Sequence, residues 1–380
     1  MRIGILGTPA KPISVHSSGG TEVFCALLSQ QLSKLGHEVF LFATPQADTP
    51  GVTVVPAVIN TMSQISKKFQ EKNNRQLTPD EKKIIDQALT ARILFKAKEY
   101  EAKLDIIHDN TSSYLTGAIS DMFNIPIVTS LHMPPSTFPE YVTLPPYITK
   151  VKNHYIAVSQ WEKNHTTVAS TVIYNGIDIN SYIYNQTGGT NLIWFGRISA
   201  ATPKGLPEAL DVSNKTHKTL LFSGYVSDKK YYDAEIKTRI GNNKSLEIMK
   251  TSEEKNKFLS SGRAALFPIQ WEEPFGLVFI EAMACGTPVI ALAKGAIPEI
   301  IQDGKTGFIV NSSDDDIRGK WIIKKTGIDG LCEAVERIYA MPKEEYVQMR
   351  KNCRAHVEKN FTVERMVDGY EKVYRNILKR

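Results

Sequence analysis

Two successive runs of strand and helix patterns predict an α/β protein with two doubly wound parallel-sheet domains. In each run, short apolar segments of strand length alternate with longer segments whose apolar residues recur at helical spacing. A polar stretch rich in turn residues, 171–190, separates the two runs. The length of 380 residues also suits two domains better than one.

The first run begins with a buried strand at 2–7, followed by a loop and a helix that starts at Thr21. Apolar residues of this helix fall at helical spacing, and Gly36 stands where a C-terminal glycine is expected. A strand at 39–43 completes a strand–helix–strand unit, which implies parallel strands. Further segments of this run are predicted as strands at 104–108, 125–130 and 154–158 and as a Lys-rich helix at 78–103.

In the second run, a helix is predicted at 277–285, closed by Gly286. Strands are predicted at 192–196, 218–224, 245–249, 264–269, 288–292 and 306–310. The last segment, 361–380, has the pattern of an amphipathic helix. We therefore divide the chain into four parts: a first domain at 1–170, a linker at 171–190, a second domain at 191–360 and a final helix at 361–380.

The composition excludes several classes of protein. Hydrophobic residues make up 42% and charged residues 23%, which excludes disorder over most of the length. A formal charge of +6 argues against a nucleic-acid binder but leaves room for an anionic ligand or membrane surface. The four cysteines form no CxxC pair, which favours a reducing compartment such as the cytoplasm. The N-terminus has the pattern of a strand rather than a signal peptide, and no apolar run reaches membrane-spanning length.

The segment Gly19-Gly20-Thr21-Glu22 is a first candidate for anion binding. It lies after the first strand and opens a helix, where free N–H groups and paired glycines let a phosphate approach closely. It matches neither a GxGxxG fingerprint nor a Walker loop. A flexible loop with a helix start is the alternative interpretation.

A second candidate is Arg197, which follows the strand ending at Gly196, together with Lys204. Ligands of open α/β sheets bind at the carboxyl ends of strands. The guanidinium fork of Arg197 suits phosphate, and Lys204 adds a point charge. The alternative is a pair of solvated cations on a loop.

The third and most informative candidate is the block EEPFGLVFIEAMACGTPVIA, which starts at Glu272. Glu273 lies just before a helix, and Glu281, separated from it by seven residues, lies about one turn inside an otherwise apolar helix. The residues 275–278 between them would offer free N–H groups. That arrangement suits a diphosphate on the backbone amides, with carboxylates accepting from sugar hydroxyls. The alternative is a helix-capping Glu and an exposed Glu.

This block resembles the E-x7-E signature of the retaining glycosyltransferases of family 4, which have the GT-B fold. Other segments fall in the family's order over nearly the whole chain: GGTE, GHEV, SLHMPP, YNGID, FGRISAATPKG, KGAIPEIIQDGKTGFIV and FTVERMVDGYEKVY. The resemblance implies two Rossmann-like domains facing a cleft, with the final helix returning to the first domain. It also implies retaining, metal-independent transfer of a sugar from a nucleotide-diphosphate sugar, expected to be a UDP- or GDP-sugar, to a hydroxyl acceptor. No cofactor is implied, and the acceptor could be a glycan, a glycolipid or a small molecule.

The resemblance assigns roles residue by residue. It places four residues at the reacting centre: His132, Glu273, Arg197 and Lys204. It places the following residues around the donor: Gly20, Arg197, Lys204, Met249, Lys250, Glu273, Phe275, Gly276, Leu277, Val278 and Glu281. Within these sets, Arg197 and Lys204 neutralise the diphosphate, Glu281 holds the ribose, and Met249 with Lys250 frames the base.

Some features stay open. Residues 225–232 have no assigned role, and the basic segment 317–327 could pack on a neighbour or a membrane. The Lys-rich stretch 67–103 is either a solvated helix face or a contact for an anionic membrane or a lipid-linked acceptor. Asp314-Asp315-Asp316 is interpreted as a solvated turn rather than a metal site, and His108 as a structural histidine.

Three alternative functions remain in view. A GT-B nucleotide-sugar epimerase would share the donor site, and a non-catalytic nucleotide-sugar binding protein would share the fold. The presence of all the matched site residues argues against the second. The missing GxGxxG argues against a dehydrogenase.

Overall fold

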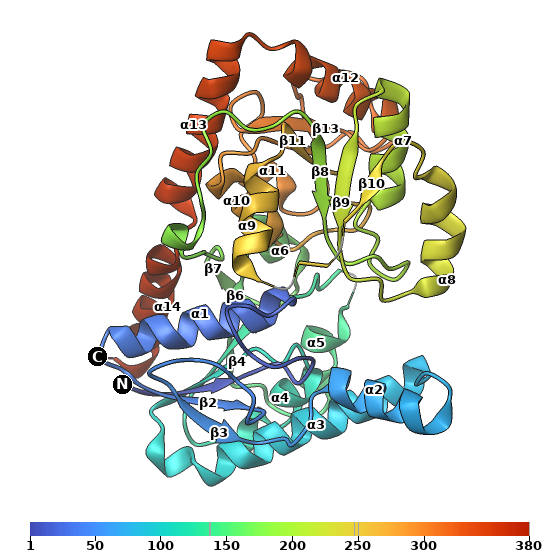
Figure 1. Cartoon of the computed structure of the whole chain (residues 1–380). Coiled ribbons are helices and arrows are strands. Elements are labelled where there is room, and N and C mark those ends of the chain that lie inside the picture. Colours follow the sequence, from blue (N-terminus) through green and yellow to red (C-terminus); the bar gives the residue numbers. More distant parts are fainter. Residues whose placement is uncertain (137, 247, 250, 380) are drawn as a thin grey trace. The chain divides into compact units, whose positions relative to one another are not determined.

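The computed structural model describes residues 1–136, 138–246, 248–249 and 251–379 (Figure 1). The chain divides into two compact units, Met1–Gly176 with Val363–Arg380 (unit 1) and Ile177–Thr362 (unit 2). This division falls inside the stretch 171–190 predicted as the linker. The first residues of that stretch belong to strand β7 (Ser170–Val172), which pairs with unit 1's sheet. The final helix, α14 (Val363–Leu378), is part of unit 1.

Unit 1 is built on a seven-stranded sheet in the order β3-β2-β1-β4-β5-β6-β7, and all of its strand pairs are parallel. Besides β7, its strands are β1 (Arg2–Leu6), β2 (Glu38–Ala43), β3 (Thr53–Pro56), β4 (Ile106–Asp109), β5 (Ile127–Leu131) and β6 (Asn153–Ala157). The five predicted strands are confirmed, with small shifts of their ends. The sequence missed β3 and β7 because they are short edge strands, of four and three residues, with little apolar pattern.

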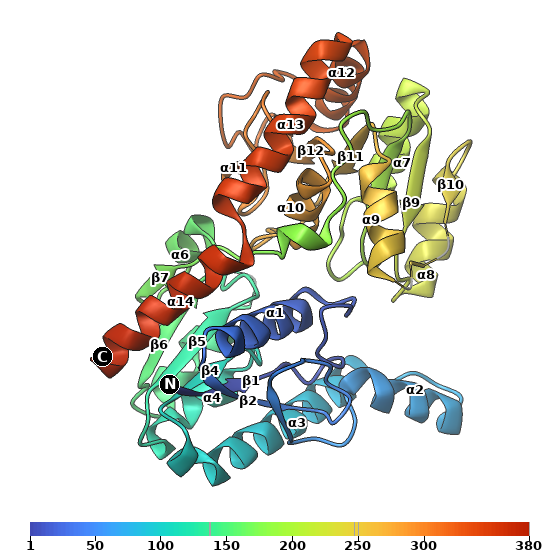
Figure 2. The same ribbon diagram turned by 60° about the vertical axis from the view of Figure 1, so that its left-hand side comes forward.

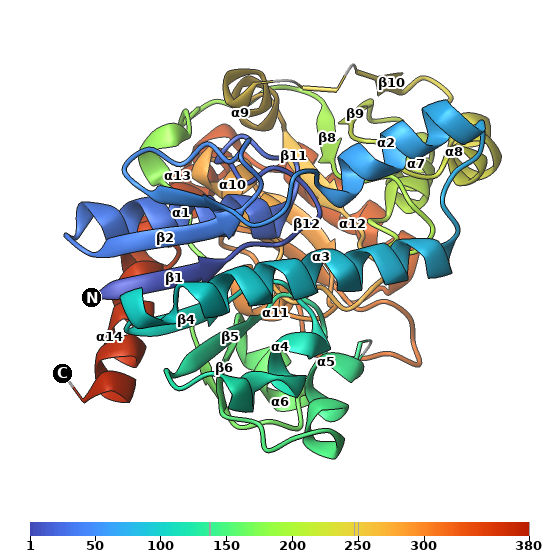
Figure 3. The ribbon, with the colours of Figure 1, turned by 90° about the horizontal axis from the view of Figure 1, so that it is seen from below.

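Helices cover both faces of this sheet, as a doubly wound fold requires. On one face, α1 (Gly20–Lys34) packs on β2 and against α14, around buried Leu28, Leu32 and Tyr370 (Figure 2). On the other face, α3 (Pro79–Glu99) lies along β1 and β2 (Figure 3). The remaining helices are α2 (Met62–Asn73), α4 (Tyr114–Ala118), α5 (Glu140–Thr143) and α6 (Gln160–His165).

Unit 2 contains a six-stranded parallel sheet in the order β10-β9-β8-β11-β12-β13. Its strands are β8 (Leu192–Phe195), β9 (Leu220–Ser223), β10 (Lys244–Ser245), β11 (Ala264–Phe267), β12 (Val289–Leu292) and β13 (Gly307–Val310). The predicted strand at 245–249 is wrong beyond Ser245 for the part of it that the structure describes, 245–246 and 248–249. The apolar side chains that suggested it, Leu246 and Ile248, are exposed next to an edge strand.

Two helix layers enclose this second sheet. On one face, α7 (Leu206–Thr216) packs with α12 (Gly327–Ala340), and on the other, α10 (Leu277–Ala284) packs with α9 (Ser252–Ser260) and α13 (Lys343–Asn360). The short helices are α8 (Lys229–Tyr231) and α11 (Ile297–Ile300). The predicted helix at 277–285 is confirmed as α10, so the E-x7-E block has the local structure that the sequence indicates.

None of the helices in the described ranges has both the length and the run of apolar residues that crossing a lipid bilayer requires.

Candidate active site

The loop ahead of α10 turns sharply into the helix. Gly276 has φ +89°, and a Cβ atom built there would lie 2.3 Å from the Phe279 ring, so only glycine fits. The first helical hydrogen bond runs from Phe279 N–H to the Gly276 carbonyl oxygen, 3.1 Å away. The N–H groups of Leu277 and Val278 precede that bond and lie at the positive end of the helix dipole. This part of the predicted anion site has the expected backbone geometry.

Two of the predicted site residues, Lys204 and Glu273, form an ion pair in unit 2 that the sequence did not indicate. Glu273 is only 6% exposed, and its Oε2 contacts the Lys204 ammonium group directly. The indole of Trp271 donates to the same oxygen over 2.8 Å and lies 4.6 Å, centroid to Nζ, from Lys204. Trp271 was not singled out from the sequence, although an aromatic residue two positions before Glu273 is a usable signal.

Two glycines allow the chain to pack closely around Arg197 and Lys204. Gly205 has φ +78°, and a Cβ there would lie 2.0 Å from the Pro268 carbonyl oxygen, which places Lys204 against the strand that leads to Glu273. A Cβ on Gly196 would lie 3.6 Å from the Cβ of Lys204. The segments that carry Arg197 and Lys204 are therefore neighbours at the carboxyl end of β8. Arg197 is exposed, and its Nη2 donates to Thr202 Oγ1 over 2.5 Å.

Glu281 lies one turn into α10 and is 5% exposed. Its Oε1 accepts from Lys255 Nζ over 2.6 Å and from the Tyr182 hydroxyl over 3.0 Å. Burial, with the Glu281 charge as a second cause, raises the pKa of Tyr182 well above its ordinary value, so that hydroxyl stays a donor. The alternative of an exposed Glu281 is excluded. Lys255 was missed because it lies on α9, 26 residues away in the sequence.

A network of ion pairs and hydrogen bonds fixes the loop before α10. Arg318 donates to both carboxylate oxygens of Glu272, over 2.7 and 2.6 Å, and Gly295 N–H donates to Glu272 Oε2 over 2.6 Å. Arg318 also binds Asp316, whose second oxygen lies 2.7 Å from Lys294 Nζ. The hydrogen bond from Arg318, followed by that from Lys294, lowers the pKa of Asp316 to about 2. The predicted turn at 314–316 is thus not freely solvated, because Asp316 is an ion-pair partner, and Arg318 of the segment 317–327 binds inside unit 2.

The structure gives few contacts for the two residues predicted to frame the base. Met249 is half-buried just ahead of α9, in neither helix nor strand, and Lys250 lies outside the described residues.

Phe275 is 2% exposed, and its ring packs edge-on against Phe361 with centroids 5.8 Å apart. Its side chain therefore supports the loop from inside, which leaves only its backbone as a ligand contact.

In unit 1, Gly20 is the first residue of α1 and is exposed. A Cβ on its neighbour Gly19 would lie 1.8 Å from a carboxylate oxygen of Glu22, so a side chain at Gly19 would displace that carboxylate. One turn further along α1, Phe24 packs edge-on against His132, with ring centroids 4.6 Å apart. The start of α1 and the end of β5 therefore lie together.

His132 follows β5 directly, and its Nε2 lies 3.0 Å from Asn110 Oδ1. Burial lowers the pKa of His132 to about 3, so the ring is neutral at physiological pH. The prediction that this histidine is held rather than mobile is supported by Phe24 on one side and Asn110 on the other.

His108 is a structural histidine, as the sequence interpretation has it. Its Nδ1 lies 2.6 Å from the Tyr374 hydroxyl and its Nε2 2.7 Å from Ser130 Oγ, which in turn lies 2.8 Å from the Tyr370 hydroxyl. This buried chain fastens α14 to β4 and β5. Neither ring nitrogen is left for an acceptor.

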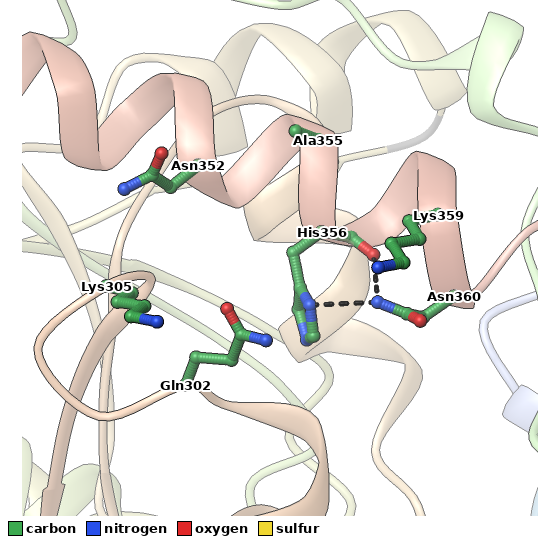
Figure 4. Close-up of a pocket in the computed structure, with 7 residues that line it drawn as sticks. All are labelled: Gln302, Lys305, Asn352, Ala355, His356, Lys359 and Asn360. Atoms are coloured by element: carbon green, nitrogen blue, oxygen red, sulfur yellow. Dashed lines mark hydrogen bonds between the residues drawn. The ribbon is translucent and has the colours of Figure 1, made fainter.

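A separate pocket of about 540 Å³ lies between the second half of α13 and the loop before β13 (Figure 4). It is lined by Gln302, Lys305, Asn352, Ala355, His356, Lys359 and Asn360, none of which belongs to the predicted site. His356 has contacts at both ring nitrogens, with the Ile300 carbonyl and the Asn360 amide, each 3.0 Å away. The two lysines of the pocket are exposed, and none of its seven lining residues is buried.

No three His, Cys, Asp or Glu side chains among the described residues gather closely enough to hold a metal ion.

Comparison with known protein families covers both halves of the chain. Residues 18–181 match the model described as Glycosyltransferase Family 4, and residues 192–356 match the model described as Glycosyl transferases group 1. The second match contains the Lys204–Glu273 and Glu281–Lys255 pairs.

Among curated proteins, the chain is similar to the D-inositol 3-phosphate glycosyltransferase of Mycolicibacterium smegmatis, at 23% identity over 88% of this chain and 84% of that protein. It is 36% identical to the N-acetyl-alpha-D-glucosaminyl L-malate synthase of Bacillus anthracis over 109 residues. That second match spans only 28% of this chain and 25% of the relative.

Among solved structures, the sucrose-phosphate synthase of Thermosynechococcus elongatus has a TM-score of 0.77 at 19% identity, covering 100% of this chain and 99% of that one. Anabaena HepE, in complex with UDP and glucose, has a TM-score of 0.73 at 18% identity, covering 99% and 100%. At such identities these likenesses bear on the fold alone. Since the family models match both halves and the solved relatives share the two-sheet architecture, the chain belongs to the family 4 glycosyltransferases of the GT-B fold.

Proposed function

We propose that this glycosyltransferase moves a sugar, with retention at the anomeric carbon, from a nucleotide-diphosphate sugar to a hydroxyl acceptor. The observation that carries the proposal is the start of α10. There, two free N–H groups, a buried carboxylate on each side and two ammonium groups are assembled within unit 2. Cations and helix-terminal amides suit a diphosphate, and buried carboxylates suit sugar hydroxyls.

Charge stabilisation of the leaving group follows from the cations of this site. As the bond to the anomeric carbon breaks, negative charge develops on the β-phosphate oxygen. Arg197, Lys204 and the amides of Leu277 and Val278 are the groups assigned to that charge. These groups supply positive charge from the protein itself, which supports transfer without a metal ion.

The contact between Lys204 and Glu273 describes the site before a donor binds. A diphosphate is a stronger attraction for the ammonium group than one carboxylate, because it carries more negative charge. Binding would therefore turn Lys204 toward the phosphates and release Glu273 to accept from the sugar hydroxyls.

Glu281 is assigned to the ribose. Lys255 and Tyr182 both donate to its Oε1. The other oxygen is the one that can accept from a ribose hydroxyl. Met249 and Lys250 follow in the chain towards α9 and are assigned to the base.

From unit 1 we assign His132 a hydrogen bond to a donor hydroxyl and Gly20 a backbone approach to the substrate. In a retaining front-face reaction the acceptor hydroxyl attacks on the side from which the diphosphate leaves. The departing phosphate oxygen then takes the acceptor's proton, so no separate general base is needed. Because burial lowers the pKa of His132 to about 3, the ring is a weak base and is better suited to hydrogen bonding than to proton abstraction.

For the donor we propose a UDP- or GDP-sugar, with no additional cofactor. A UDP complex of the structural relative HepE supports the uridine option. The names of the curated relatives include an N-acetyl-alpha-D-glucosaminyl L-malate synthase and a D-inositol 3-phosphate glycosyltransferase, which supports a hydroxyl acceptor. An epimerase would need no acceptor, and neither the family models nor the named relatives favour it.

The experiment that tests this proposal is a donor panel. Purified protein with excess EDTA should be warmed with UDP-, GDP- and ADP-sugars, and one class should raise its melting temperature and be slowly hydrolysed. The sugar released or transferred should keep the donor's anomeric configuration by NMR. Replacing Glu281 by alanine should weaken binding of the matching nucleoside diphosphate by about 1.5–3 kcal/mol, the range for hydrogen bonds to a charged group. Glu333→Ala, on the surface of α12, is the matched control and should bind normally.

Several outcomes would contradict parts of the assignment. Inverted product would exclude retention, and a strict need for Mg²⁺ would exclude metal independence. Unchanged nucleotide affinity in Glu281→Ala would remove Glu281 from the ribose site.

We also propose that α2 and the first half of α3 contact an anionic membrane surface, where a lipid-linked acceptor would reside. Figure 2 shows α2 extending away from the sheet of unit 1, and it has no buried residue. On α3, Lys82, Lys83 and Ile84 are consecutive and exposed, with Ile84 66% exposed. Neither lysine has a carboxylate partner among the described residues. Exposed cations beside an exposed apolar residue are typical of a surface that binds anionic lipid.

Reversing both charges in Lys82→Glu/Lys83→Glu should weaken binding to phosphatidylglycerol vesicles roughly 30-fold or more, since each lysine near such a surface contributes about 1 kcal/mol. Vesicle co-sedimentation at low salt would measure it. Lys229→Glu/Lys230→Glu, an equally exposed adjacent pair on α8, is the control and should bind like the unchanged protein. Absence of vesicle binding by the unchanged protein would refute the membrane contact and leave the transfer reaction untouched.

A further inference from the structure

One polar contact of His132 determines what the histidine can bind. The ring is placed by two neighbours: the Phe24 edge, 4.6 Å away between centroids, and the Asn110 amide oxygen, 3.0 Å from Nε2. No described residue hydrogen-bonds to Nδ1. The ring therefore has one nitrogen held by the protein and one left for another partner.

The orientation of the Asn110 amide is set by its surroundings. Its Nδ2 lies 3.4 Å from the carbonyl oxygen of His108, and its own backbone N–H donates to Leu6 oxygen over 3.0 Å. If the amide were turned over, its oxygen would face the His108 carbonyl oxygen, and two acceptors would repel each other. The Nδ2 group therefore faces His108, and Oδ1 faces His132.

An amide oxygen only accepts hydrogen bonds, so the Nε2 that faces it must carry the proton. In a neutral imidazole the other nitrogen, Nδ1, is then unprotonated and accepts. Asn110 is fully buried and follows β4 just as His132 follows the adjacent β5, so the parallel sheet fixes both residues. The amide cannot turn to water, and the ring loses its partner if it flips.

We propose that Asn110 is a positioning residue that holds His132 as its Nε2–H tautomer, so that Nδ1 is presented as an acceptor for a substrate hydroxyl. The inference rests on the proposed function and deepens it, since it specifies the chemistry of the group that His132 meets. An unprotonated Nδ1 attracts a hydroxyl, which can donate, and not a phosphate oxygen, which cannot. His132 thereby belongs to the recognition of the sugar and is excluded from binding the diphosphate.

The arrangement also explains why a neutral ring is retained here. An imidazolium would carry a proton on Nδ1 and would no longer accept from a hydroxyl. The amide oxygen of Asn110 orients the ring without the negative charge that a carboxylate would bring, which would favour the protonated form.

The test uses tautomer assignment by NMR on the full chain with ¹⁵N-labelled histidine. In the unchanged protein, Nε2 of His132 should have the shift of a protonated nitrogen and Nδ1 that of an unprotonated one, constant from about pH 5.5 to 8. In Asn110→Leu, which keeps the shape of the side chain but removes the acceptor, the two shifts should move toward each other as both tautomers become populated. Asn124→Leu, an exposed asparagine ahead of β5, is the control and should leave both shifts in place. The His132 signals are identified by their absence in His132→Gln.

The second part of the test measures steady-state kinetics with the nucleotide sugar that the donor panel identifies. Asn110→Leu should lower kcat about 10-fold with little change in KM for the donor, because the ring is misoriented and the nucleotide site is intact. In a His132→Ala background the same substitution should have no further effect on kcat. Additive losses would show that Asn110 acts elsewhere.

The two arms separate the possible failures. A protonated Nδ1 in the unchanged protein, or an unaltered tautomer in Asn110→Leu, overturns the positioning role even if the enzyme transfers sugar. If no sugar is transferred, the NMR result still decides whether Asn110 fixes the ring.

Discussion

Replacing Arg350 by leucine should lower the free energy of unfolding of unit 2 by about 3–5 kcal/mol. Arg350 lies on α13 with 0% exposure, and it has no carboxylate partner among the described residues. Its guanidinium instead donates to main-chain carbonyl oxygens and two hydroxyls: Asn185 O at 2.7 Å, Gly262 O at 2.8 Å, Tyr346 Oη at 3.0 Å, Ser260 O at 3.1 Å, Thr287 Oγ1 at 3.3 Å and Cys285 O at 3.4 Å.

The expected loss of unfolding free energy comes from the buried groups that Arg350 donates to, which would lose that donor. Leucine would remove the arginine donor from the carbonyl oxygens of Asn185 and Gly262, at about 1–3 kcal/mol each. Arg350 also donates to Ser260 O and Cys285 O, at the ends of the two helices that carry Lys255 and Glu281, and these oxygens keep a second donor from Asn185. The same substitution should therefore also loosen the candidate donor site.

Urea unfolding followed by tryptophan fluorescence would measure this loss, because Trp194, Trp271 and Trp321 lie in unit 2 and only Trp161 lies in unit 1. Arg337→Leu is the matched control. That arginine is exposed on α12, and its one ion pair within the described residues is with Glu333, four residues earlier, so its loss should change stability by less than about 0.5 kcal/mol. Equal midpoints for the two variants would show that the buried donor is dispensable.

The sequence identifies the chemistry of the site better than its supporting contacts. The E-x7-E spacing places Glu273 and Glu281 on either side of a helix start, because one turn of helix and a short loop are local geometry. Lys255 and Tyr182 could not be found in this way. Each reaches Glu281 from a distant element, and nothing in its local sequence marks it as a partner.

The burial of Arg350 could not be predicted from the sequence either. An arginine in a polar helical segment is normally exposed, and its burial here depends on carbonyls that converge from three separate loops. The short edge strands β3 and β7 escaped prediction for a related reason: they are held by pairing with a neighbour rather than by their own apolar pattern. The contact of Arg318 with Glu272 could not be predicted from the basic segment 317–327 either, because the two residues lie 46 positions apart in sequence.

The ion pairs found around α10 have a consequence for substrate binding. Lys204 and Lys255 both lie on buried carboxylates, so neither glutamate is an uncompensated charge while the site waits for a donor. An unpaired buried carboxylate would be costly. Lys204, which we assign to the phosphates, thus also compensates the charge of Glu273 and must exchange that partner for phosphate when the donor binds, whereas Lys255 remains the partner of Glu281.

Replacing His132 by alanine should lower kcat by about 100-fold or more, roughly 2.7 kcal/mol of barrier, with little change in affinity for the nucleoside diphosphate. The ring lies at the carboxyl end of β5, where parallel sheets bind their ligands, and it is fixed by Phe24 and Asn110. Its assigned hydrogen bond to a donor hydroxyl strengthens as positive charge develops at the anomeric carbon, because that charge makes the hydroxyl a better donor. The interaction is therefore stronger in the transition state than in the bound substrate, and its loss appears in kcat.

Single-turnover rates and nucleotide titration would separate the two effects, with His154→Ala, an exposed histidine on β6, as the matched control. Since burial holds the pKa of His132 near 3, the ring stays neutral over the working range, and removing it should lower the whole pH–rate profile without moving its limbs. A limb near pH 6.5 that disappears in the variant would instead identify His132 as a titrating acid or base. A loss of nucleoside diphosphate binding equal to the loss in rate would assign the residue to donor anchoring, and near-normal turnover of a well-folded variant would remove it from the site.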